Sequence, residues 1–281
     1  MECHQPTGSF KIRGIETVCR HYIEQGKKSF IISSGGNAGY SLAYAGKQLG
    51  ARVRVIVPET TSATMIEKIR MLDADVDVHG KVWDEANAYT QALLTTGDYT
   101  FIHPFDHPLL WQGHSSIIDE CATQMPQPGK IVVAVGGGGL LSGIFEGMKR
   151  NGWNKTTVIT AETEGAASFL KSYEAKKVTA LTEINTIAGS LAAKKVAVNA
   201  VEMAEHFTIS PFITSDAGAI KACGSFFNEF NILVEPACGA ALAYPYSSAV
   251  QINEGEQILI IACGGICMDM NQYLDYAGRY K

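Results

Sequence analysis

The chain has 281 residues, a formal net charge of −5 and 46% hydrophobic residues, enough apolar content to bury one large core or two moderate ones. Like charges do not gather in blocks, so we expect neither a nucleic acid nor a membrane surface as a partner. No apolar run reaches the roughly 20 residues that span a bilayer, and the first residues lack the pattern of a signal peptide. We therefore expect a cytoplasmic protein.

The first third of the chain alternates between strand-like and helix-like segments. Apolar runs predict strands at 29–33, 52–57, 76–78 and 99–102. Apolar residues at helical spacing predict a helix that starts at Lys11 and further helices at 37–49, 63–72 and 83–94. This alternation predicts a parallel sheet covered by helices.

A segment rich in proline and histidine, 103–108, interrupts the alternation and is the predicted crossover to a second α/β half. The strands predicted there are 130–135, 157–161 and 257–262. The helices predicted there are 110–123, 140–149, 166–173, 197–205, 217–230 and 238–250. We therefore predict a small α/β domain over 5–106 and a large one over 107–281, with ligand loops in the cleft between them.

Lys11 lies between a turn, which Pro6 and Gly8 supply, and the amphipathic helix that it begins. We expect its amine at a helix N-terminus beside Phe10, where the helix dipole and partial desolvation lower its pKa. Such a lysine can form a Schiff base with a carbonyl. An isolated lysine is more often a surface residue. Two ligand-binding loops elsewhere in the chain favour the functional interpretation.

The first of these loops is the tetraglycine at 136–139, which lies between a buried strand and a helix. Four residues without side chains let consecutive backbone N–H groups close on one anion. The spacing matches neither a P-loop nor the dinucleotide fingerprint, so a small phosphate monoester fits better than a nucleotide. A merely tight turn would need only one or two glycines.

The second loop, Ser-Ser-Gly-Gly-Asn-Ala-Gly at 33–39, has the same strand–loop–helix context. Its N–H and O–H groups suit a carboxylate, and Asn37 suits a phenolate oxygen. By itself, Ser34 or Asn37 is equally well explained as an ordinary helix N-cap. Because the chain also contains Lys11 and the tetraglycine, we favour the ligand-binding interpretation.

Cys263 ends the last buried strand at a glycine turn, which places its thiol toward the cleft. A weak donor or acceptor there suits a neutral heteroaromatic nitrogen. The alternative is an inert core thiol. That alternative is what we expect of the other six cysteines, because their spacing suggests neither disulfides nor a zinc site.

Together these segments resemble the fold-type-II pyridoxal-phosphate (PLP) enzymes, most closely the L-serine/L-threonine dehydratase (ammonia-lyase) family. The resemblance rests on QPTGSFKIRG at 5–14, SSGGNAG at 33–39, GKVWDEAN at 80–87, PFDHPLLWQGH at 104–114, AVGGGGLLSG at 134–143 and LVEPACGAAL at 233–242. It implies two open, twisted, mostly parallel sheets flanked by helices, as in the tryptophan synthase β-subunit, with the cofactor between the domains.

The resemblance also implies a role for each cofactor-binding residue. Lys11 would hold PLP covalently and later remove the α-proton of the substrate. Phe10 would pack on the ring, Asn37 would contact its phenolic oxygen and Cys263 its pyridine nitrogen. The phosphate would be bound by Gly136, Gly137, Gly138 and Gly139.

Two further sets of residues follow from the same resemblance. The substrate carboxylate would be held by Ser34, Gly35, Asn37 and Ala38. A structural monovalent or divalent cation would be held by Glu162, Ala166 and Ser168, although a carboxylate after a strand is more often solvated or caps a helix.

The chain departs from the family pattern at two places. Relatives begin further upstream, with a segment that completes the large domain, so we expect either that the start of the chain is misplaced or that the protein is a short form with an exposed sheet edge. Relatives also usually carry Ser-Asn where this chain has Ile266 and Cys267, a change that we expect to alter how the turn supports the ring.

The expected reaction is β-elimination of L-serine to pyruvate and ammonia, with L-threonine to 2-oxobutanoate as a second reaction, in a homodimer. One alternative is a serine racemase, which needs a second acid/base on the opposite ring face; Ser190 is the hydroxyl whose placement would decide this. The other alternative is a truncated paralogue that binds cofactor or amino acid without turnover.

Overall fold

The computed structural model describes residues 1–95 and 97–280, which form two four-stranded sheets. The N-terminal sheet has the order β3-β2-β1-β4, and its described pairings are all parallel. Its strands are β1 (Ser29–Ser33), β2 (Arg52–Val57), β3 (Asp75–Val78) and β4 (Thr100–Phe101). The accompanying helices are α1 (Lys11–Glu24), α2 (Asn37–Leu49), α3 (Ala63–Arg70) and α4 (Trp83–Leu94).

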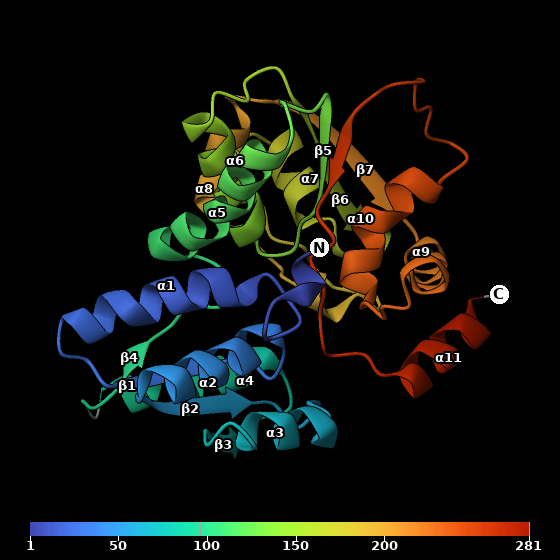
Figure 1. The fold of residues 1–281 in the computed structure, drawn as a ribbon. Helices are drawn as coiled ribbons and strands as arrows, with labels where there is room; N and C mark the ends of the chain where they lie inside the picture. Colours follow the sequence, from blue (N-terminus) through green and yellow to red (C-terminus); the bar gives the residue numbers. More distant parts are fainter. Residues whose placement is uncertain (96, 281) are drawn as a thin grey trace.

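Both faces of the N-terminal sheet are covered, as a parallel sheet requires. Phe30 and Ile32 of β1 pack in a cluster with residues of α1 and α2. Ile31, between them, faces the opposite side and packs with Ala86 of α4. This alternation follows from the two-residue period of a strand, and Figure 1 shows this half with α1 and α2 in blue.

The C-terminal sheet has the order β7-β6-β5-β8, again with parallel pairings. Its strands are β5 (Lys130–Ala134), β6 (Thr157–Thr163), β7 (Thr208–Thr214) and β8 (Ile258–Ile260). The accompanying helices are α5 (Pro108–Gln124), α6 (Gly139–Arg150), α7 (Ser168–Glu174), α8 (Val198–Ala204), α9 (Asp216–Phe230), α10 (Pro236–Tyr246) and α11 (Met270–Arg279). The predicted α/β fold of two parallel sheets is confirmed, whereas the domain boundary at 106/107 stays a prediction.

The strand β7 and the helix α11 were not predicted. The strand β7 contains Pro211, which lacks an N–H for the sheet ladder and so counts against a strand. β7 lies at the edge of its sheet, where a missing donor is tolerated. The helix α11 was missed because none of its residues is fully buried; it starts at a capping box between Asp269 and Gln272.

The start of α1 is fixed by contacts with segments far away in the sequence. Arg13, with 11% of its side chain exposed, pairs with Glu2 at 2.6 Å and with Glu120 of α5 at 2.6 Å. Ser9 forms an antiparallel bridge with Gly264, and the Phe10 N–H donates to the Cys263 carbonyl oxygen at 3.2 Å. The residues before α1 therefore hold the segment after β8, and α5 packs against both α1 and α6 between the two halves (Figure 1).

Candidate active site

Lys11 is half-buried and begins α1. Its Nζ donates a hydrogen bond to the Pro104 carbonyl oxygen at 2.7 Å and lies 5.1 Å from the centroid of the Phe10 ring. Burial lowers the pKa of Lys11 from 10.5 to about 8, against opposing effects of Cys263 and Glu235. Because this pKa lies near neutrality, a sizeable fraction of the amine is unprotonated and nucleophilic at a slightly alkaline pH.

The tetraglycine leads from β5 into the N-terminus of α6. The N-cap residue Gly138 has a φ of +82°, and in the described part of the chain no side chain caps this helix. The N–H groups of its first turn thus stay available for an anion, with the helix dipole in favour. Phe105 packs directly on the loop, because a Cβ at Gly137 would lie 2.3 Å from its ring.

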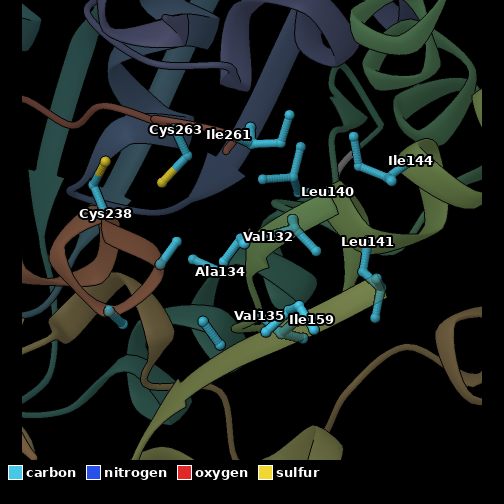
Figure 2. Packing of buried hydrophobic residues seen from close by; sticks show 14 of the residues in the cluster. Val132, Ala134, Val135, Leu140, Leu141, Ile144, Ile159, Cys238, Ile261 and Cys263 are labelled. Carbon is cyan, nitrogen blue, oxygen red and sulfur yellow. The ribbon is translucent and has the colours of Figure 1, made fainter. Parts of the chain in front are cut away.

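Cys263 sits between the carboxyl end of β8 and the start of α1. Interaction with the Cys238 thiol and burial raise its pKa well above the ordinary value of 9.0. The thiol therefore stays neutral over the physiological range. Figure 2 shows Cys263 and Cys238 beside the core residues of β5 and α6.

Asn37, the first residue of α2, joins the two halves of the molecule. Its Oδ1 accepts the Ile266 N–H at 3.0 Å, and its Nδ2 donates to Glu235 Oε1 at 2.8 Å. The Ser190 hydroxyl lies 3.3 Å from the same Nδ2. Burial raises the pKa of Glu235, a shift that Ser190 and Asn37 partly offset.

One cavity brings the predicted cofactor residues together. It is lined by Ser9, Phe10, Lys11, Asn37, Phe105, Ala134, Gly136, Gly137, Gly138, Gly139, Leu140, Leu141, Ser190, Leu191, Glu235, Ala237, Cys263 and Gly264. Every residue that we predicted to contact the cofactor is in this set. The ring of Phe10 is held edge-on by His114, with 4.9 Å between ring centroids.

The other predicted sets lie outside the cavity lining, apart from Asn37, which the substrate set shares with the cofactor set. Among the described residues, Ser34, Gly35 and Ala38 do not line it, although they surround the start of α2 beside Asn37. Gly36, the N-cap residue, offers no side chain, so in the described part of the chain the first N–H groups of α2 have no side-chain cap. Their role toward a substrate carboxylate stays a prediction.

Glu162, at the end of β6, contacts the start of α7. Its carboxylate oxygens accept the N–H groups of Phe169 at 2.7 Å and Leu170 at 2.8 Å. Burial raises its pKa to about 7 despite these two bonds. Ser168 and Ala166 are buried close by, but no cluster of three or more His, Cys, Asp or Glu side chains suited to a metal occurs within 1–95 and 97–280. The cation site stays a prediction.

Glu235 and Phe105 line the cavity, although the sequence analysis assigned them no role. Glu235 lies in LVEPACGAAL and Phe105 in PFDHPLLWQGH, segments that carried the family resemblance. Neither residue lies in a local pattern that marks a ligand-binding site. Each lines the cavity beside a residue that is distant in sequence: Glu235 beside Asn37, and Phe105 beside Gly137. Their presence in those segments was the only available signal.

The lining residues fit pyridoxal phosphate. An amine with a lowered pKa suits its aldehyde, the uncapped N-terminus of α6 suits its phosphate, and the neutral Cys263 thiol suits its pyridine nitrogen. The fold and the cavity thus define a PLP enzyme.

Comparison with known proteins gives the same class. The family described as pyridoxal-phosphate dependent enzyme matches residues 1–264, and the chain belongs to it. L-serine dehydratase of Dictyostelium discoideum is 42% identical over 279 residues, which cover 93% of this chain and 79% of that protein. Human L-serine dehydratase/L-threonine deaminase is 40% identical over 282 residues, covering 97% and 86%. Within the PLP enzymes, the chain belongs to this serine/threonine dehydratase family.

Solved structures agree. A fungal L-serine ammonia-lyase from Rhizomucor miehei superposes with a TM-score of 0.95 and 30% identity, covering 100% of this chain and 92% of that one. Maize serine racemase, with a TM-score of 0.89 and 24% identity, shares the fold. In the described residues, every helix is too short or too polar to cross a membrane.

Proposed function

We propose that this protein catalyses the PLP-dependent β-elimination of L-serine to pyruvate and ammonia, and of L-threonine to 2-oxobutanoate. The observation that carries the proposal is the Lys11 amine, with a pKa of about 8, in one cavity with the tetraglycine and Cys263. The similarity to L-serine dehydratases supports this choice of substrate.

Each cofactor-contacting residue has a distinct task in this proposal. Lys11 holds the cofactor, Gly136–Gly139 bind its phosphate through backbone N–H groups, and Phe10 packs on its ring. Bound PLP supplies a conjugated ring that withdraws electrons from the α-carbon of an amino acid. The neutral Cys263 places no acid at the pyridine nitrogen, which favours elimination over transamination.

Lys11 also moves the proton in this mechanism. After the substrate amine has displaced Lys11 from the cofactor, the freed and unprotonated Nζ would take the α-proton of the substrate, a task that suits a base with a pKa near the working pH. A proton would be returned to the departing β-hydroxyl, which leaves as water. The Pro104 carbonyl oxygen, 2.7 Å away, accepts a hydrogen bond from this Nζ and can hold the amine in the cavity when it is not bound to the cofactor. Ser34, Gly35, Asn37 and Ala38, at the positive end of α2, hold the substrate carboxylate.

Three further features belong to the proposal on the strength of the family resemblance: a cation at Glu162, Ala166 and Ser168, assembly as a homodimer, and a cytoplasmic location. None of them is needed for the proton transfer at Lys11.

The test is turnover by the PLP-loaded protein. With L-serine as substrate, pyruvate and ammonia should appear in equal amounts, while Lys11→Ala should give neither. Because Ser190 lines the cavity, D-serine should be measured in the same reactions. Formation of D-serine without pyruvate would identify a serine racemase instead of a dehydratase. PLP binding without either product would identify a protein that binds the cofactor but has no turnover.

A further inference from the structure

The Asn37 side chain is held in one orientation. It is 7% exposed, its Oδ1 faces the Ile266 N–H, and its Nδ2 faces the oxygens of Glu235 and Ser190. A donor on one side and acceptors on the other leave the amide no equally good flipped state. The contact with Ile266 uses its backbone N–H, so the unusual side chain at this position does not prevent it.

The side chain of Glu235 does not cap the helix that it precedes. It is the N-cap residue of α10, yet among the described residues its side chain accepts no N–H from that helix. The carboxylate turns instead to Asn37, 198 residues away in the sequence, at 2.8 Å. A side chain in this place would ordinarily cap the helix or face solvent, but Glu235 is 5% exposed and lines the cavity.

The segment after β8 fixes the carboxylate in place. Gly265 has a φ of +126°, and a Cβ there would lie 2.1 Å from the Glu235 Cδ. Only glycine therefore lets the backbone wrap this closely around the carboxylate. The rotation of Glu235 is restricted, and so is that of the amide bonded to it.

We propose that Glu235 is a positioning residue that acts through Asn37, holding its amide so that an N–H faces the phenolic oxygen of PLP. One amide N–H stays on Glu235. The other, now directed at Ser190 Oγ over the longer distance of 3.3 Å, is the one that passes to the ligand oxygen. This inference rests on the proposed function, because it assumes that PLP occupies this cavity.

The experiment is a double-mutant cycle on PLP binding, measured as a dissociation constant by titrating the apoprotein and following the visible absorbance. Loss of the acceptor that holds the Asn37 amide predicts about tenfold weaker binding in Glu235→Ala. Glu235→Gln keeps an acceptor for Asn37 and should bind within about threefold of the wild type. In an Asn37→Ala background, Glu235→Ala should weaken binding by less than about twofold.

The controls separate positioning from a general loss of fold. Thr160→Val replaces a fully buried hydroxyl on β6, outside the cavity, and should leave PLP binding unchanged. Apoprotein melting temperatures show whether each variant folds, and if Glu235→Ala does not, Glu235→Leu, which keeps the volume of the side chain but offers Asn37 no acceptor, takes its place in the cycle. If the two alanine substitutions weaken binding additively, Glu235 does not act through Asn37. Failure of the wild type to bind PLP would instead refute the proposed function.

Discussion

The Nζ of Lys11 and the carbonyl oxygen of Pro104 lie 2.7 Å apart, which ties the start of α1 to the crossover between the two sheets. The same crossover places Phe105 on the tetraglycine. His103 orders this segment, since its Nδ1 accepts the N–H groups of Phe105 at 3.2 Å and Asp106 at 2.7 Å. The crossover is therefore part of the cavity as well as a connection.

The pKa of Lys11 predicts how fast the apoprotein captures PLP at different pH values. Only the unprotonated amine attacks an aldehyde, so below the pKa of about 8 the rate should rise about tenfold per pH unit. Above pH 8 it should level off. Stopped-flow absorbance of PLP mixed with apoprotein measures this rate, and a midpoint near the ordinary lysine pKa of 10.5 would show that the amine is not desolvated.

His103 predicts a loss of stability in mild acid. Burial lowers its pKa from 6.5 to about 4, so between these values the unfolded chain binds the extra proton. Stability is therefore full above pH 6.5 and falls as the pH approaches 4, by on the order of 3 kcal/mol from this residue. Urea unfolding of wild type and His103→Asn at several pH values checks this. The same pH slope in both proteins would mean that His103 contributes nothing.

The tetraglycine predicts a substitution that affects binding more than folding. In Gly137→Ala the new methyl group would lie 2.3 Å from the ring of Phe105 beside the cavity, so the ring must shift and PLP affinity should fall about tenfold. Gly138 is less suitable, because its Cβ would point at Val196 and Ala200 and its φ is +82°. Gly278→Ala, on α11 with open space around it, is the matched control. Equal affinities of the two variants would assign the loop a purely structural role.

The proposed cation site predicts a salt-specific gain in stability. Ser168 Oγ is buried and has no hydrogen-bond partner within the described chain, and the next residue, Phe169, donates its N–H to the Glu162 carboxylate. A bound potassium ion should raise the melting temperature relative to tetramethylammonium chloride at equal ionic strength, and Ser168→Ala should remove the gain. Ser142→Ala, also a buried hydroxyl without a partner in the described part, should keep it. Identical melting of the wild type in both salts would argue against the site.

The sequence predicted what local patterns encode. The strands before each glycine loop are short apolar runs, and the helix starting at Lys11 follows a turn. Local patterns therefore predict the elements that carry Lys11, Asn37, the tetraglycine and Cys263. That parallel strands end at one edge then predicted a common cavity. The edge strand β7 was not predicted, because its Pro211 counts against a strand.

The rest of the site depends on contacts that no local pattern encodes. Glu235 reaches Asn37 across 198 residues, and Phe105 covers Gly137 from another element. Whether such side chains face a ligand or a core depends on the packing of α2, α10 and the segment after β8, which composition and periodicity do not specify. Glu235 and Phe105 can therefore be recognised as cavity-lining residues only from the three-dimensional arrangement of both halves.

The most direct test of the account is to find where PLP attaches. The apoprotein is incubated with PLP, reduced with borohydride, digested and mapped by mass spectrometry, while an unreduced portion is assayed for pyruvate from L-serine. We expect a single pyridoxyl group on Lys11, pyruvate formation by the unreduced protein, and loss of both in Lys11→Ala. A modified lysine elsewhere, or pyruvate formation by Lys11→Ala at the wild-type rate, would contradict it.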